Sequence, residues 1–95
     1  MSLPADPAAA LIELPLVISE LSRARTAHTE AHVVELTARH ATLRARLTGG
    51  DSVSAAERWA EIDAATAQYE KMRWRAKVEI LTDQRDYLIA LISSE

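Results

Sequence analysis

The chain contains two glycines, and they are adjacent, at Gly49 and Gly50, near the middle of its 95 residues. Glycine ends helices readily, because it adopts left-handed backbone conformations without a steric penalty. After Pro15 the sequence contains no other strong helix stop. We therefore predict two long segments joined by one turn over residues 48–54. The length of the chain limits it to a single domain.

Composition and spacing favour helices in both segments. Alanine, the strongest helix former, supplies 18 residues, whereas phenylalanine and cysteine are absent. The lack of cysteine excludes disulfides and thiolate chemistry. Apolar residues at helical spacing predict a first helix over residues 16–47. Ser54 and Glu57 form a capping-box pattern, which predicts a second helix over residues 55–92. The expected fold is an all-α, long antiparallel helical hairpin.

Pro15 complicates the start of the first helix, because proline lacks a backbone donor and crowds the carbonyl four residues before it. Asp6 and Pro7 are typical of a cap and a first helical position. We expect a flexible stretch over residues 1–6, followed by a short helix over residues 7–14. This short helix is either separate or a kinked extension, and we favour a separate helix folded back over the open end of the hairpin.

A hairpin centred near Gly50 places residues opposite each other when their numbers sum to about 101. Small residues then face small ones, and large residues face large ones. The predicted pairs are Ala41 with Ala60, Ala45 with Ala56, Ala38 with Ala64, Leu21 with Leu81, Leu14 with Tyr87, and Leu43 with Trp59.

The second helix is apolar on more than one face near its C-terminal end, and one neighbouring helix covers only one face. We therefore expect a second chain to cover the remainder. A homodimeric four-helix bundle is the leading architecture, although a different protein partner would satisfy the same physics. The predicted interface residues are Leu11, Leu14, Ile18, Trp74, Val78, Leu81, Tyr87, Leu88, Leu91 and Ile92.

The net charge of −3 is too small for global attraction to nucleic acid or anionic lipid. A local basic belt remains as an alternative nucleic-acid site that would hold phosphates without reading sequence. In that case the protein would be a small nucleic-acid-binding regulator. Antiparallel pairing of two second helices about residue 67 would instead set the basic cluster against acidic residues. The belt consists of Arg23, Arg25, Lys71, Arg73, Arg75 and Lys77.

A weak metal candidate consists of His28 and His32, four residues apart, with Glu35 one turn further. These are ligand types that Zn²⁺ uses. The position of the intervening glutamate differs from that in the zincin motif, and the ordinary alternative is histidines that flank a polar midsection. Glycine-rich phosphate loops and paired Glu-x-x-His motifs are absent from the sequence. We therefore expect no cofactor, and a non-enzymatic oligomerisation or adaptor protein.

The longest uninterrupted apolar run, residues 87–92, is far shorter than the roughly 20 residues that span a bilayer. The first six residues carry no basic side chain, which is atypical of a secretory signal. The expectation is a cytoplasmic protein with no membrane partner.

Overall fold

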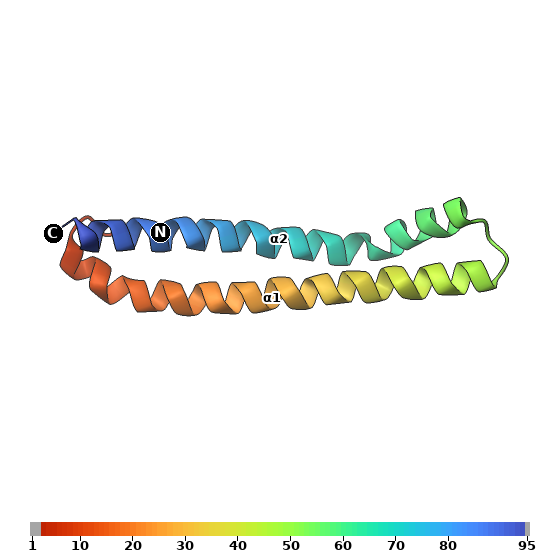
Figure 1. Cartoon of the computed structure of the whole chain (residues 1–95), viewed down its shortest axis with the longest axis horizontal. Coiled ribbons are helices and arrows are strands. Elements are labelled where there is room, and N and C mark those ends of the chain that lie inside the picture. Colours follow the sequence, from red (N-terminus) through yellow and green to blue (C-terminus); the bar gives the residue numbers. More distant parts are fainter. Residues whose placement is uncertain (1–2, 95) are drawn as a thin grey trace. The chain divides into compact units, whose positions relative to one another are not determined.

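The computed structural model describes residues 3–94 and contains two antiparallel helices, α1 (Pro7–Thr48) and α2 (Val53–Ser93), joined by a turn (Figure 1). No strand occurs in residues 3–94. The predicted all-α helical hairpin is therefore confirmed. The first two residues of the stretch that we expected to be flexible lie outside the described part of the chain.

Helix α1 begins where the sequence places a cap. The Oδ1 atom of Asp6 accepts hydrogen bonds from the backbone N–H groups of Ala8 and Ala9, at 2.8 and 3.1 Å. These amides have no acceptor within the helix, so the carboxylate satisfies them. Pro7 occupies the first helical position, where its missing N–H is not needed.

The prediction of a separate helix over residues 7–14 is wrong, because α1 runs through Pro15 without a break. Figure 1 shows the first turns of α1, drawn in red, inclined to the turns that follow. The proline removes one backbone hydrogen bond and bends the helix locally. Leu14 and Val17 on either side of it belong to the same hydrophobic cluster, which stabilises the continuous helix.

The turn is built on a left-handed glycine. Gly50 has a φ of 97°. Its N–H donates to the carbonyl of Leu47 at 3.1 Å, and the N–H of Asp51 donates to the carbonyl of Arg46 at 3.0 Å. This pair of bonds is a Schellman motif, which satisfies carbonyls that the end of α1 leaves free.

Helix α2 is capped by Ser52, whose Oγ accepts a hydrogen bond from the N–H of Ala55 at 3.2 Å. The predicted cap at Ser54 is therefore wrong, and the turn covers residues 49–52 instead of 48–54. Ser52 follows the Schellman motif directly, so its hydroxyl reaches the free amides before that of Ser54.

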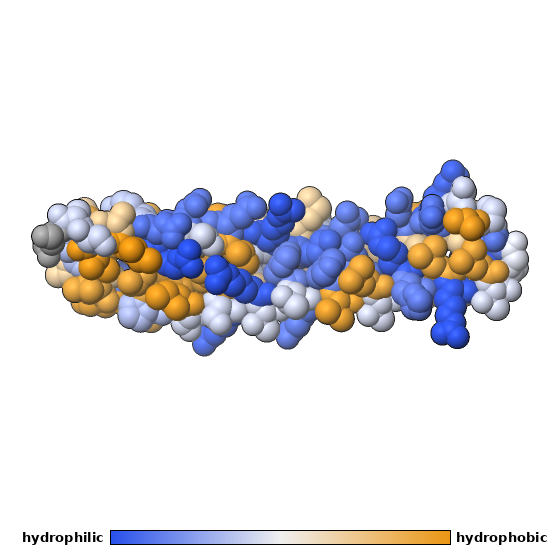
Figure 2. Space-filling view, in the orientation of Figure 1, coloured by the Kyte–Doolittle hydropathy of each residue, from blue (hydrophilic) through white to orange (hydrophobic). Residues whose placement is uncertain are grey.

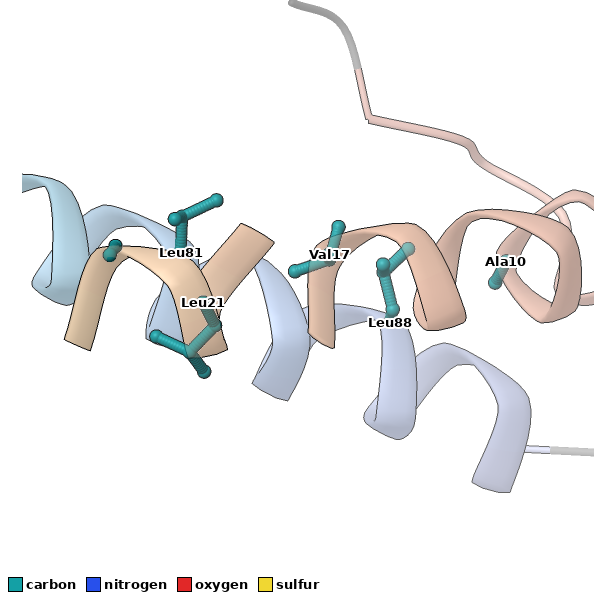
Figure 3. Packing of buried hydrophobic residues seen from close by; sticks show 6 residues of the cluster. Ala10, Val17, Leu21, Leu81 and Leu88 are labelled. Carbon is teal, nitrogen blue, oxygen red and sulfur yellow. The ribbon is translucent and has the colours of Figure 1, made fainter. Parts of the chain in front are cut away.

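The chain forms two compact units. We call Met1–Thr26 with Trp74–Glu95 the terminal unit, and Ala27–Arg73 the turn unit. In the terminal unit, large aliphatic side chains from both helices form one buried cluster, of which Figure 3 draws six residues. The predicted partners Leu21 and Leu81 both belong to it. The buried members are Ala10, Val17, Leu21, Ala24, Leu81 and Leu88.

In the turn unit, the buried apolar residues are the alanines Ala56, Ala60 and Ala64 of α2. Their predicted partners Ala41 and Ala45 are exposed, so those two pairings are wrong. On α1 a subset of the buried and half-buried positions follows a spacing that alternates between three and four residues, which is the heptad spacing of helices packed along their length. This subset is 28, 31, 35, 38 and 42; positions 27, 39, 43 and 46 are also half-buried, whereas positions 41 and 45 are exposed.

We predict that Gly50→Ala lowers the free energy of unfolding by about 1–2 kcal/mol, because a Cβ disfavours a left-handed backbone. Gly50→Asn is the matched control, since asparagine tolerates this region better, and its loss should be smaller. Chemical denaturation at one fixed protein concentration measures both. Equal stability of Gly50→Ala and the parent chain would contradict the role assigned to this residue.

Candidate functional site

The structure divides the predicted interface residues into three groups. Leu81 and Leu88 are 4% and 0% exposed within their own chain, so neither is free to contact a partner. Five others are half-buried against the same cluster. The exposed members are Leu11, Ile18 and Tyr87. The Tyr87 hydroxyl donates a hydrogen bond to the carbonyl of Pro4 at 2.9 Å.

The terminal unit also exposes large apolar side chains that the sequence analysis did not assign to an interface. They are Leu3, Ile12, Leu16, Ile80 and Ile89. Figure 2 shows apolar residues gathered over the end of the molecule at which α1 begins and α2 ends. For Ile80 the sequence contained a signal, because Ile80 lies on a second apolar stripe of α2 together with Tyr87 and Leu91.

A buried polar cluster lies between the helices of the turn unit. The Nζ atom of Lys71 is 2.6 Å from Glu35 Oε2, and Arg39 Nη2 is 3.1 Å from Glu35 Oε1. Glu35 is 5% exposed, although it is charged. His32 is adjacent, with Nδ1 3.5 Å from the same Lys71 nitrogen. One carboxylate is therefore compensated by two cations, as a buried charge requires.

The contact with Lys71 lowers the pKa of the Glu35 carboxyl below its ordinary value, and Arg39 acts in the same direction. Burial opposes this shift, because it penalises the charged form. The attraction to the two cations outweighs desolvation, so the carboxylate is ionised at neutral pH. Glu35 and Lys71 both occupy seam positions on their helices, a signal that the sequence contained and that we assigned to other chemistry.

This cluster accounts for residues that the sequence analysis placed in a metal candidate. Glu35 faces Lys71 and Arg39, which are cations themselves. Residues 3–94 contain no group of three or more His, Asp or Glu side chains placed to hold a metal ion. Of the three candidate residues, Glu35 belongs to the ion-pair cluster and His32 lies beside it.

The predicted basic belt is distributed over both units. Arg23, Arg25, Arg75 and Lys77 belong to the terminal unit, and Lys71 and Arg73 to the turn unit. Several of these cations have partners within the chain, which lowers the charge available to a phosphate backbone. The pairs are Lys71 with Glu35 at 2.6 Å, Arg73 with Glu70 at 3.0 Å, Arg75 with Glu79 at 3.6 Å, and Lys77 with the Trp74 ring at 5.5 Å.

An apolar groove of about 410 Å³ opens in the turn unit. Two carboxylates line it, and both are engaged: Thr42 Oγ1 donates a hydrogen bond to Asp63 at 2.8 Å, and Glu70 pairs with Arg73 at 3.0 Å. The groove therefore offers an apolar surface to an occupant. Its lining residues are Ala31, Val34, Ala38, Asp63, Thr66, Ala67 and Glu70.

Comparison of the chain with protein-family models, with curated proteins and with solved structures found no match. In neither helix do the described residues include a stretch both long and apolar enough to cross a membrane. Function is therefore inferred from the surfaces and contacts of this chain alone.

We predict that Lys71→Met lowers the free energy of unfolding by roughly 1–3 kcal/mol, because it leaves a buried carboxylate with one cation. Replacing both partners, as Glu35→Leu/Lys71→Leu, should cost less than Lys71→Met or raise stability. Arg73→Met, which breaks an exposed pair, is the control and should change stability by no more than about 0.5 kcal/mol. A double variant less stable than Lys71→Met would contradict this account.

The lowered pKa of Glu35 also predicts how stability depends on pH. A carboxyl whose pKa is lower in the folded state stabilises the fold above its unfolded pKa, and this contribution disappears as the pH falls through the folded pKa. Denaturation between about pH 6 and pH 3 should therefore show a steeper loss for the parent chain than for Glu35→Gln. Glu79→Gln, at an exposed position, should keep the parent slope; identical slopes in all three chains would exclude this role of Glu35.

Proposed function

We propose that this protein is a non-enzymatic helical assembly or adaptor protein that self-associates, with a dimeric four-helix bundle as the assembly. Part of its remaining apolar surface then docks a further protein partner. One observation carries the proposal: large apolar side chains remain outside a contact between α1 and α2 that is already filled.

These side chains occur in both units and include branched aliphatic and aromatic types. A helix in a monomeric hairpin normally carries polar residues on the faces turned away from its neighbour. Burial of each such side chain by a partner contributes about 1.5–3 kcal/mol. Those exposed in the terminal unit are Leu3, Leu11, Ile12, Leu16, Ile18, Ile80, Tyr87 and Ile89, and in the turn unit Val33, Val34, Leu36, Leu47, Val53, Trp59, Ile62, Tyr69 and Met72.

Rearrangement within the chain offers no alternative cover for these residues. In the terminal unit the inner face of the helices is occupied by Val17, Leu21, Leu81 and Leu88. A rotation of either helix that buried the exposed apolar residues would expose these four inner residues instead. We propose that another polypeptide supplies the additional burial.

The polar groups support a non-enzymatic protein. Catalytic carboxylates are usually paired with one another or with a base in a closed pocket. Here the buried carboxylate of Glu35 is held by Lys71 and Arg39 at the seam. The carboxylates of Asp63 and Glu70 in the open groove are bound by Thr42 and Arg73.

Sedimentation equilibrium over a range of micromolar concentrations tests self-association. We expect a species of twice the 10.5 kDa chain mass, which dissociates only on dilution. Circular dichroism on the same dilution series shows whether the helices depend on the assembly. A fully helical chain that stays monomeric at every concentration would refute the proposal.

A further inference from the structure

The groove in the turn unit is apolar, and the two carboxylates that line it have hydrogen-bond partners within the chain. Val34 is 57% exposed, although it lines the groove, and Ala31, Ala38 and Ala67 provide small side chains around it. Glu70 is paired with the cation Arg73, and Asp63 accepts a hydrogen bond from Thr42. An apolar helix face of low relief fits such a groove.

Helix α1 itself presents such a face. Alanine or valine occupies positions 27, 31, 34, 38, 41 and 45, at a spacing that alternates between four and three residues. The pattern is symmetric about residue 36, since Ala27 corresponds to Ala45, Ala31 to Ala41, and Val34 to Ala38. A second α1 running antiparallel therefore meets alanine or valine at matching positions, as a two-fold contact requires.

The charges along α1 favour a second copy of α1 as the occupant of the groove, and they favour the antiparallel direction. Glu30, Thr37 and Arg44 are seven residues apart, so they form a line along α1 beside the face just described. Glu30 and Arg44 are exposed, and neither has an ion pair in the part of the chain that the structure describes.

Antiparallel pairing near residue 36 sets Glu30 against Arg44 of the second copy, with an axial offset of about 3 Å, and two-fold symmetry makes this pair twice. Parallel pairing would set Glu30 against Glu30 and Arg44 against Arg44, which is repulsive. The same packing covers Ala41 and Ala45, which the hairpin leaves exposed.

We propose that the turn-unit groove binds α1 of a second copy of this chain, with the two α1 helices antiparallel and crossing near residue 36. This inference rests on the proposed function and assigns the self-association contact to the turn unit. The apolar residues of the terminal unit then remain available to the further protein partner.

Substitution in the groove is the first test. Val34→Glu should weaken the dimer at least tenfold in sedimentation equilibrium, because it places a charge in the apolar contact. Val33→Glu is the matched control: it adds the same carboxylate to the neighbouring exposed position, outside the groove. Its dissociation constant should stay within about twofold of the parent value. Equal weakening by the two substitutions would overturn the assignment of this face.

Disulfide trapping tests the antiparallel direction, and the absence of cysteine makes single-cysteine variants unambiguous. Chains with Ala31→Cys and with Ala41→Cys are mixed and oxidised. In the proposed register a mixed disulfide between the two chains dominates. Residues 31 of both copies lie about 15 Å apart along the axis, too far for a bridge. Disulfides between identical chains would instead indicate parallel packing and overturn the inference.

Charge reversal gives a rescue test on exposed residues. Glu30→Arg should weaken the dimer several-fold, and Glu30→Arg/Arg44→Glu should restore it. A chain that is monomeric from the outset refutes the proposed function and this inference together. A stable dimer whose dissociation constant is unchanged by Val34→Glu, and which forms no mixed disulfide, refutes this inference alone. The proposed function then still holds.

Discussion

The structure depends on the burial of one face of each helix against the other, and this contact differs between the two units. In the terminal unit its buried members include large aliphatic side chains such as Leu21, Leu81 and Leu88. In the turn unit it is made by alanines, whose small side chains bury little area but permit close approach of the backbones. A contact of the second kind is less well stabilised by the hydrophobic effect.

The ion pairs of Glu35 with Lys71 and Arg39 lie within that weaker contact. A buried charge is tolerated only with its partners in place, so the cluster disfavours every register of the two helices that separates Glu35 from Lys71. Buried ion pairs of this kind contribute more to the choice of one helix register than to the free energy of folding. The same ion pairs involve Glu35 of the metal candidate and Lys71 of the basic belt.

Because the contact between α1 and α2 is already occupied, the apolar residues on the outer faces of the helices remain exposed. These exposed residues are the basis of the proposed function. In the turn unit the exposed apolar residues include Val34 and the alanines at 41 and 45, and these belong to a set of alanine and valine positions whose spacing is symmetric about residue 36 of α1. Symmetry of this kind has no value for packing against α2, which has a different sequence. It is useful when the neighbour is another α1.

The sequence by itself determined the all-helical hairpin and the position of its turn, because adjacent glycines and the cap at Asp6 act through local backbone chemistry. It also placed Leu21 and Leu81 in one core, since large residues at helical spacing specify a buried face. Only the tertiary structure decided that α1 continues through Pro15, that Ser52 caps α2, and that Ala41 and Ala45 point outward. The path through Pro15 and the orientation of the two alanines depend on packing between the helices, whereas the choice of Ser52 follows from the Schellman motif directly before it. Local sequence patterns also could not predict the pairing of Glu35 with Lys71, because these residues are 36 positions apart and meet only when both helices are packed.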